Sequence, residues 1–293
     1  METKWGAHIS PPSYSEMLER FNSSMSRRGW KHVSSLLYSK TTDFTKLKIA
    51  EVGCGSGTGS FMLGLLGAKV ALIDYDKKVI EKVKKIYEMW GVNAEFYNIS
   101  CLDEPPDNLL NTFDNVCSGG LAEHFLGEDR LKCIKFHYKL TKKGGFTSIG
   151  VPNRFSLFYR TVVGFRRITG TFGIDVECPF SYGELLSCAQ KIGFDRSYVL
   201  GSEYLSRDFK VYSIGLVSAM IDIMPEKLKT AIRSRTRKSK TLPVSCGGIT
   251  NRTGYIAKVK GQILHNMKNA SSPPPSGLAD IFSAGIILFG FKD

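Results

Sequence analysis

Residues 51–60 read EVGCGSGTGS, and four of these ten residues are glycine. A short apolar run, KLKIAEVG (46–53), leads into the glycines and has the composition of a buried strand. The apolar residues of SGTGSFMLGLLG (56–67) recur at helical spacing. A strand that enters a glycine-rich turn and then a helix is a nucleotide-binding arrangement, because glycine permits a positive φ and lets the backbone approach a ligand closely.

Strands and helices go on alternating after this turn. The predicted strands cover 68–74, 93–99, 113–119 and 145–152, and the predicted helices cover 76–91 and 128–140, the second broken by Gly144-Gly145. Asp76 and Gly91 stand at the N-cap and the C-cap of the first of these helices. This alternation predicts an α/β fold with a parallel sheet and helices on both faces.

Three kinds of nucleotide ligand compete for the glycine-rich turn. The dinucleotide fingerprint G-x-G-x-x-G fails, because its third glycine falls on Thr58 or on Ser60. The P-loop fails as well, because no Gly-Lys-Ser/Thr follows. The spacing E-V-G-C-G-S-G over 51–57 resembles motif I of the class I S-adenosylmethionine (SAM)-dependent methyltransferases.

Further segments resemble the same family in the same order, nearest its UbiE/UbiG-like branch. Asp74 ends the second strand 21 residues after Gly53, where a carboxylate is suited to accept hydrogen bonds from ribose hydroxyls. The segments 113–125, 144–153, 180–194 and 284–293 resemble the family's fourth strand, fifth strand, following helix and last strand. The resemblance implies a seven-stranded, mostly parallel Rossmann-like sheet with an antiparallel last strand and a substrate-covering insertion.

The resemblance also implies where the cofactor binds, namely at the ends of the first four strands. The implied residues are Glu51, Gly53, Cys54, Gly55, Gly57, Asp74, Tyr75, Ser100, Cys101, Ser118 and Gly119. The implied cofactor is SAM, with S-adenosylhomocysteine as its product. Since SAM carries no phosphate, the loop needs no lysine.

The chain departs from the family pattern at two places. Many relatives carry an acidic residue after the third strand, near the adenine, whereas this chain has Ser100 there and Asp103 slightly later. Some relatives bind a divalent metal through E-x-x-E-H, and here Gly120 replaces the first glutamate of that pattern. One carboxylate and one imidazole make a poor site for a hard cation, so we predict no metal.

His124 is the candidate general base and Glu123 the residue that orients it. Methyl transfer from a sulfonium is an in-line displacement in which positioning does much of the catalysis, and a base helps only where the acceptor atom carries a proton. An imidazole with a pKa of about 6.5 can accept that proton at neutral pH. A structural role, with His124 packed on the glycine loop and Glu123 capping a turn, weighs equally with this one.

The remaining sequence divides into less regular parts. We divide the chain into an N-terminal helical cap (1–44), the SAM-binding core (45–153), a core helix and strand with a lid insertion (154–270) and a return strand (271–293). One or two helices are expected in the cap, with Tyr14, Phe21 and Trp30 either lining the cofactor pocket or packing. The aromatic and basic stretch 152–173 has no clean period, and 211–224 fits a helix or a strand.

The net charge of +13 favours an anionic partner. Residues 227–240 carry seven Lys or Arg, and we rank a solvated helix face first, an anionic membrane surface second and RNA third. Seven scattered cysteines without a C-x-x-C pair suit a reducing compartment, and the N-terminus shows no apolar signal segment, so a cytoplasmic location is predicted.

Taken together, these features predict a SAM-dependent methyltransferase that acts on a small organic or lipid-like acceptor. An RNA methyltransferase is one alternative, and its N-P-P-Y-type tetrapeptide is missing, because residues 118–121 read SGGL. A non-catalytic SAM-binding regulatory protein is the other. The acceptor, its target atom, the pathway and the oligomeric state are left open.

Overall fold

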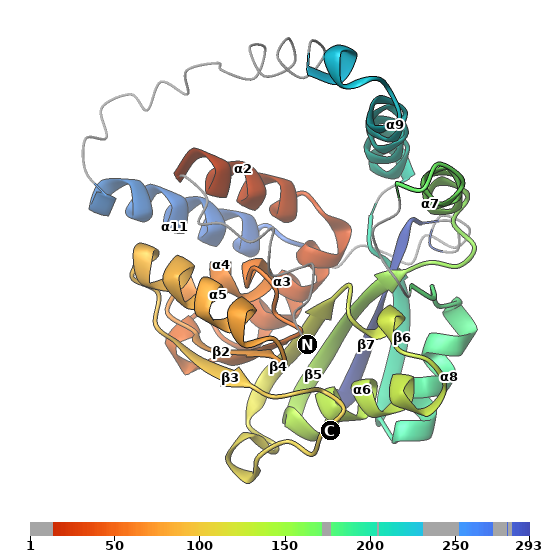
Figure 1. Ribbon diagram of the computed structural model, residues 1–293. Helices are drawn as coiled ribbons and strands as arrows, with labels where there is room; N and C mark the ends of the chain where they lie inside the picture. The colour runs from red at the N-terminus through yellow and green to blue at the C-terminus, as the bar shows by residue number, and fades with distance from the viewer. Residues whose placement is uncertain (1–13, 172–176, 204, 231–251, 272–279, 281–282) are drawn as a thin grey trace.

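The computed structural model describes residues 14–171, 177–203, 205–230, 252–271, 280 and 283–293. These residues form one seven-stranded sheet of order β3-β2-β1-β4-β5-β7-β6 (Figure 1). The strands are β1 (Lys48–Val52), β2 (Lys69–Asp74), β3 (Ala94–Asn98), β4 (Phe113–Gly119), β5 (Thr141–Pro152), β6 (Arg196–Gly201) and β7 (Gly285–Lys292). The first five strands pair in parallel, and β7 is antiparallel to both β5 and β6. The predicted mostly parallel sheet with an antiparallel last strand is confirmed.

Helices cover both faces of this sheet. One layer holds α2 (Tyr14–Met25), α3 (Arg28–Lys40), α4 (Thr58–Leu65), α5 (Lys77–Trp90) and α11 (Arg252–Lys268), and the other holds α6 (Gly127–Leu140) and α8 (Tyr182–Ile192). Successive strand residues point to opposite faces, so Ile49 belongs to the core under the first layer and Ala50 to the core under the second.

Two of these helices begin and end at the residues that the sequence indicated. The Asp76 side chain accepts a hydrogen bond from the backbone N–H of Lys78, and Gly91 ends α5 in the left-handed conformation. Ser181 and Glu184 form both hydrogen bonds of a capping box at the start of α8. At both helices, the capping residues and the apolar face that packs on the sheet indicate the same element.

In the N-terminal segment the described residues form two helices, α2 and α3, and α11 lies beside them although it is far away in the sequence (Figure 1). Phe21 is fully buried, and its ring centroid lies 5.7 Å from that of Phe61 and 6.2 Å from that of Trp90. Phe21 is therefore a packing residue of the helical layer. Trp30 packs partly buried against the same core, and the side chain of Tyr14 lies outside the described ones.

The less regular parts of the sequence differ most from expectation. The glycine pair Gly144-Gly145, predicted to break a helix, lies inside β5, because α6 already ends at Leu140 and the strand begins with the next residue. The stretch 152–173 contains a helix, α7 (Leu157–Ile168), which the sequence analysis did not assign. Most of the undecided segment 211–224 belongs to the helix α9 (Leu205–Asp222), and the core strand expected without bounds within 154–270 is β6.

α7 and α9 pack against each other beyond the end of the sheet (Figure 1). Most of the basic run, 231–240, lies outside the described residues. No helix within the described ranges is long and apolar enough to cross a bilayer.

Candidate functional site

The turn between β1 and α4 is built on three glycines in the left-handed conformation. Gly53, Gly55 and Gly57 have φ values of 61°, 49° and 66°. A Cβ added at Gly53 would lie 2.7 Å from the Leu121 side chain, and one at Gly57 would lie 2.6 Å from Val83, so these two positions need glycine for packing. A Cβ at Gly55 would meet no atom of the described residues within 4 Å. Gly55 thus presents bare backbone to space that the described residues leave open, where a ligand can lie against it.

The Glu51 carboxylate anchors this loop through hydrogen bonds to the start of α4. Its carboxylate accepts hydrogen bonds from the backbone N–H groups of Gly59, at 3.2 Å, and Ser60, at 2.8 Å, and from the Ser60 hydroxyl at 2.6 Å. The Tyr87 hydroxyl adds a hydrogen bond to the carbonyl of Gly57 at 2.8 Å. Burial raises the pKa of Glu51, and the bonds from Ser60 oppose that shift. The acidic residue of the motif therefore fixes the start of α4, and direct contact with a cofactor stays a prediction for it.

Asp74 lies beside the open glycine. One carboxylate oxygen accepts a hydrogen bond from the backbone N–H of Gly55 at 3.2 Å, and the other accepts one from Asp76 at 3.0 Å. Asn98 donates to the carbonyls of Asp74, at 3.1 Å, and Tyr75, at 2.8 Å, which holds the end of β2 against the end of β3. Burial raises the pKa of Asp74, and the backbone hydrogen bonds work against that shift. Tyr75 itself is exposed.

The other predicted cofactor residues come to the same edge of the sheet, because the carboxyl ends of parallel neighbours meet there. Cys54 is buried, and its N–H donates to the carbonyl of Ile73 at 3.1 Å. The Ser100 hydroxyl accepts from the N–H of Leu102 at 3.1 Å, and Cys101 is buried beside it. At the end of β4, the buried Ser118 hydroxyl has no hydrogen-bond partner among the described residues. The neighbouring Gly119 faces open space, since a Cβ there would meet nothing within 4 Å.

Glu123 and His124 follow β4 in the short 3-10 helix η3 (Ala122–His124). Glu123 is buried, and its Oε2 has no hydrogen-bond partner within the described part of the chain. Burial raises the pKa of Glu123 to about 8, and the nearby Glu177 carboxylate raises it further, whereas Arg130 lowers it. Glu123 is thus mostly protonated at neutral pH and can donate a hydrogen bond. His124 is half-buried.

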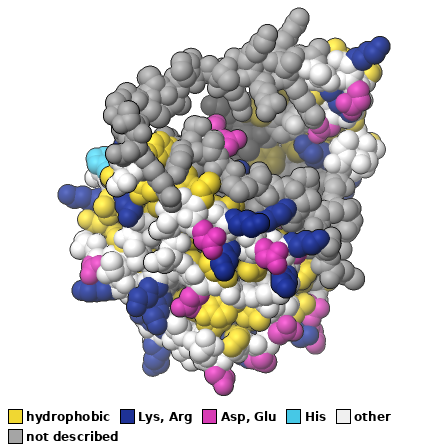
Figure 2. Space-filling view, turned by 60° about the vertical axis from the view of Figure 1, so that its left-hand side comes forward, with side chains coloured by type: hydrophobic (Ala, Val, Ile, Leu, Met, Phe, Trp, Pro, Cys, Tyr) yellow, Lys and Arg dark blue, Asp and Glu magenta, His cyan; other side chains and the backbone are white. Residues whose placement is uncertain are grey.

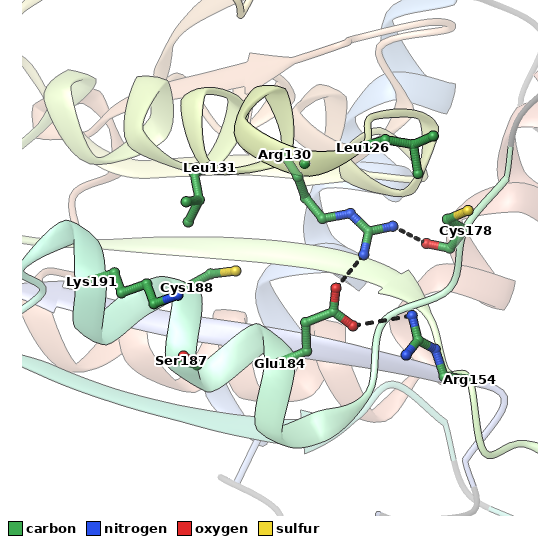
Figure 3. A pocket seen from close by; sticks show the side chains of 10 residues that line it. Leu126, Arg130, Leu131, Arg154, Cys178, Glu184, Ser187, Cys188 and Lys191 are labelled. Atoms are coloured by element: carbon green, nitrogen blue, oxygen red, sulfur yellow. Dashed lines mark hydrogen bonds and ion pairs between the residues drawn. The ribbon is translucent and has the colours of Figure 1, made fainter.

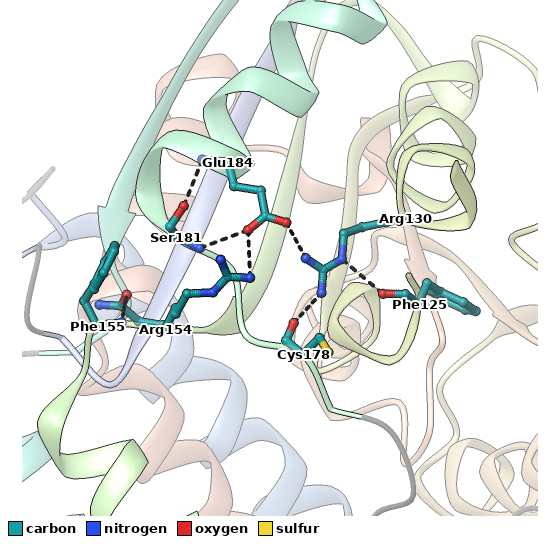
Figure 4. Close-up of polar contacts among 8 residues, drawn as sticks. Phe125, Arg130, Arg154, Phe155, Cys178, Ser181 and Glu184 are labelled. Carbon is teal, nitrogen blue, oxygen red and sulfur yellow. Dashed lines mark hydrogen bonds and ion pairs between the residues drawn. The ribbon is translucent and has the colours of Figure 1, made fainter. Parts of the chain in front are cut away.

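A guanidinium that the sequence analysis missed fixes the position of this 3-10 helix. Arg130 of α6 donates to the carbonyl of Phe125 at 3.0 Å and also bonds the Cys178 carbonyl and the Glu184 carboxylate (Figure 4). The backbone N–H of Cys178 in turn donates to the Glu123 carbonyl at 2.9 Å. The network therefore ties η3 to α6 and α8. No local pattern reveals it, since Cys178 and Glu184 lie far along the chain from Arg130.

The same residues line a pocket between α6 and α8 (Figure 3). Its volume is about 310 Å³, and Leu131, Cys188 and Lys191 line it together with Arg130 and Glu184. None of the predicted cofactor residues lines this pocket. Because the described bonds occupy the guanidinium of Arg130, we interpret the pocket as a groove beside the structural network, separate from the strand-end site.

Of the other histidines, two are buried. His137 lies in α6, where a ring nitrogen contacts the Cys133 carbonyl at 2.8 Å and burial lowers its pKa to about 4. His32 contacts the hydroxyl of Tyr198, and burial with the neighbouring charge of Arg28 lowers its pKa to about 4. The sequence showed no partner for His32, because Tyr198 comes from the distant strand β6.

The segment that holds the glycine loop is similar to a known protein family. A family model described as "Methyltransferase domain" matches residues 49–145, from the first strand through the glycine loop to the start of β5. Residues 49–145 are a class I methyltransferase domain. The methyl donor of this class is SAM.

The relatives of the methyltransferase domain match over part of their length. A mitochondrial ubiquinone biosynthesis O-methyltransferase of Mus musculus is 31% identical over 118 residues, which are 39% of this chain and 30% of that protein. An uncharacterized protein of Methanocaldococcus jannaschii is 33% identical over 103 residues, 34% of this chain and 40% of that protein. The matched part thus spans less than half the length of either relative. A solved SAM-dependent methyltransferase from Archaeoglobus fulgidus aligns over 88% of this chain and 92% of its own, at 14% identity and a TM-score of 0.45.

The geometry of the methyltransferase domain fits SAM. A ligand can approach the bare backbone at Gly55 closely, and the buried Asp74 carboxylate beside it, which accepts one backbone N–H on each oxygen, keeps lone pairs for further donors. In the described residues, no group of three His, Cys, Asp or Glu side chains has a metal-binding arrangement.

Proposed function

We propose that this chain transfers a methyl group from SAM to a small organic or lipid-like acceptor. The observation that carries the proposal is the juxtaposition of Gly55 and Asp74. A glycine whose Cβ position has no atom of the described part of the chain within 4 Å donates its N–H to a buried carboxylate at the carboxyl edge of a parallel sheet. Ligands of open α/β sheets bind at this edge, at the point where the strand order reverses. In this sheet the order reverses between the neighbouring strands β1 and β4.

Each group at the edge has a proposed part in holding the cofactor. The loop 53–57 would pack on the adenosyl and methionyl parts, and Asp74 would accept hydrogen bonds from the ribose. Ser100 and Cys101 would bind on the adenine side, and Ser118 and Gly119 on the methionyl side. Bound SAM supplies an activated methyl group on a sulfonium.

We propose that His124 removes the acceptor's proton where the acceptor atom carries one. A ring nitrogen of neutral His124 takes that proton as the acceptor's lone pair attacks the methyl carbon, so positive charge passes to the imidazole. With its pKa of about 8, Glu123 is mostly neutral at pH 7 and serves as a hydrogen-bond donor rather than as the base. The Arg130 network keeps η3, which carries both side chains, in place against α6 and α8.

The test compares two glycines with matched backbones. Gly55→Asp puts a side chain and a charge where SAM is expected to lie. Gly144→Asp is the control, because Gly144 also has a positive φ, 71°, and also meets nothing within 4 Å, but it lies near the opposite end of β5. Calorimetry of S-adenosylhomocysteine should give micromolar affinity, about −8 kcal/mol, for the natural chain and the control, and no binding for Gly55→Asp.

The outcome separates the functional alternatives. Unchanged affinity in Gly55→Asp, or binding of NAD instead, would reject the site. Binding without turnover on small, lipid-like and RNA acceptors would favour the regulatory alternative, and turnover on RNA alone would favour the RNA alternative.

A further inference from the structure

Lysines gather at the amino edge of the sheet, the edge where its parallel strands begin. Lys48 is the first residue of β1 and Lys69 the first residue of β2, and the two stand side by side in the register of these strands. Both side chains are exposed, and neither forms an ion pair with a described residue. Like charges on neighbouring strands repel each other, so this pair costs the fold some stability.

The turn at the start of β5 brings two more lysines to this edge. In the register of β4 and β5, residues 142–145 stand opposite the single residue Asp114, so they bulge from the sheet. The buried Asp114 carboxylate pairs with the ammonium of Lys142 at 2.7 Å and accepts the backbone N–H of Lys48 at 3.0 Å. Asp114 therefore joins the turn to the start of β1. Lys143, the next residue of the turn, is exposed.

The carboxylates at this edge leave several of the lysines unpaired. Asp114 pairs with Lys142, and Asp43, which precedes β1, pairs with Lys46 at 3.5 Å. The ammonium of Lys40, at the end of α3, donates to the carbonyl of Gly144 in the β5 turn, which is an uncharged group. Four lysines of this edge thus form no ion pair within the described part of the chain, namely Lys40, Lys48, Lys69 and Lys143. Over the α5 side of the molecule, by contrast, Figure 2 shows acidic and basic side chains interspersed.

These lysines follow a row along the edge. The strands β2, β1, β4 and β5 are successive neighbours in the sheet. Since neighbouring strands lie about 4.8 Å apart, the row from Lys69 to the β5 turn is about 14 Å long. One strand of a nucleic-acid duplex carries a phosphate about every 3.4 Å along the helix axis, so the row matches about four phosphates. None of the exposed large apolar side chains in the described residues belongs to this edge.

We propose that this amino edge binds the phosphate backbone of a nucleic acid, independently of its base sequence. The phosphates pair with the four lysines and relieve the repulsion between Lys48 and Lys69. Contacts of this kind hold a nucleic acid in place and carry no sequence information. An anionic bilayer fits this edge less well, because the edge offers no exposed apolar side chain to enter it. The candidate cofactor site lies at the opposite edge of the sheet, so the nucleic acid is an attachment site for the protein and not its methyl acceptor.

The test is the fluorescence anisotropy of labelled RNA and DNA duplexes of mixed sequence, titrated with the full chain at several salt concentrations. With about four phosphates neutralised, the affinity of the natural chain should fall about 150-fold between about 50 mM and 200 mM salt. Lys48→Gln combined with Lys69→Gln should weaken binding about tenfold or more and lower the slope of log affinity against log salt by about two. Lys69→Gln combined with Lys143→Gln should have the same effect. Lys258→Gln combined with Lys260→Gln is the matched control, because these exposed lysines of α11 likewise form no ion pair with a described residue, and binding should not change.

Several results would overturn the nucleic-acid proposal. These are no binding to either duplex at about 50 mM salt, an unchanged salt slope in both variants of the edge, or an equal loss in the Lys258→Gln/Lys260→Gln control, which would mean that net charge alone attracts the duplex. Binding to vesicles of phosphatidylcholine and phosphatidylglycerol without binding to a duplex would assign the edge to a bilayer instead. Binding of either duplex supports the proposal, and the tighter one identifies the natural partner. The proposal is independent of the proposed function, because Gly55→Asp should lose S-adenosylhomocysteine and keep its affinity for the duplex.

Discussion

Replacing Asp74 with alanine tests the centre of the cofactor site. The Asp74 carboxylate already accepts the N–H groups of Gly55 and Asp76, one on each oxygen, at 3.2 and 3.0 Å. Each oxygen has a second lone pair, so the group can also accept a ribose hydroxyl. Hydrogen bonds to a charged group are worth about 1.5–3 kcal/mol, and losing that contribution should raise the dissociation constant for S-adenosylhomocysteine roughly tenfold to 150-fold.

Titration calorimetry at neutral pH measures that change directly. Asp43→Ala is the matched control, because Asp43 also caps a backbone N–H, that of Thr45 at 3.2 Å, but lies before β1 at the opposite edge of the sheet. Its affinity should equal that of the natural chain. A thermal melt of each variant shows whether the loop is still folded.

The reasoning fails if Asp74→Ala melts like the natural chain and binds within about threefold of it, which is less than 1 kcal/mol. It also fails if the Asp43→Ala control loses the same affinity, because the loss would then reflect general destabilisation.

Two further predictions concern the 3-10 helix after β4. His124→Ala should lower turnover by about 10² to 10⁴ and leave SAM affinity nearly intact, as single-turnover kinetics and calorimetry would show; a joint loss of affinity and melting temperature would mean that His124 is structural. With its pKa raised to about 8, folded Glu123 keeps a proton that the unfolded chain has released, so the free energy of unfolding falls as pH rises from its ordinary pKa toward 8. Glu123→Gln removes this dependence. In urea titrations, the free energy of unfolding of the variant relative to that of the natural chain should rise by on the order of a few kcal/mol between about pH 5 and pH 8.5. A difference that does not change with pH would contradict the assignment.

The parts of the fold that the sequence predicted carry local and tertiary signals that agree. α5 has a capping aspartate, a terminal glycine and an apolar face that includes Val83 and Trp90, and the structure buries that face. α7 carried a local signal that was missed, because Ser156 stands at its N-cap and accepts a hydrogen bond from the N–H of Tyr159, and the helix is strongly amphipathic. The core strand expected within 154–270 could not be given bounds, because the burial of β6 depends on its pairing with the distant strand β7.

The residues of the candidate site also divide into those that local sequence spacing could locate and those that it could not. The glycine loop and Asp74 could be located from spacing, since a turn, a strand end and a helix start lie within a short stretch of chain. The raised pKa of Glu123 could not, because it arises when distant segments bury the carboxyl and bring Glu177 near it. The role of Arg130 could not be predicted either, because its partners Cys178 and Glu184 lie far from it in the sequence.

The position of β7 has a consequence for how the sheet opens. β7 lies between β5 and β6, and β6 forms the end of the described sheet with β7 as its neighbour there. Each of the edge strands β3 and β6 can fray without disturbing a second strand, whereas any fluctuation that releases β7 must also release the amides of β6. In native-state hydrogen exchange, the opening free energy of β7 should therefore be at least as large as that of β6. The last strand in the chain should be better protected from solvent than either edge strand, because protection follows a strand's place in the sheet rather than its place in the sequence.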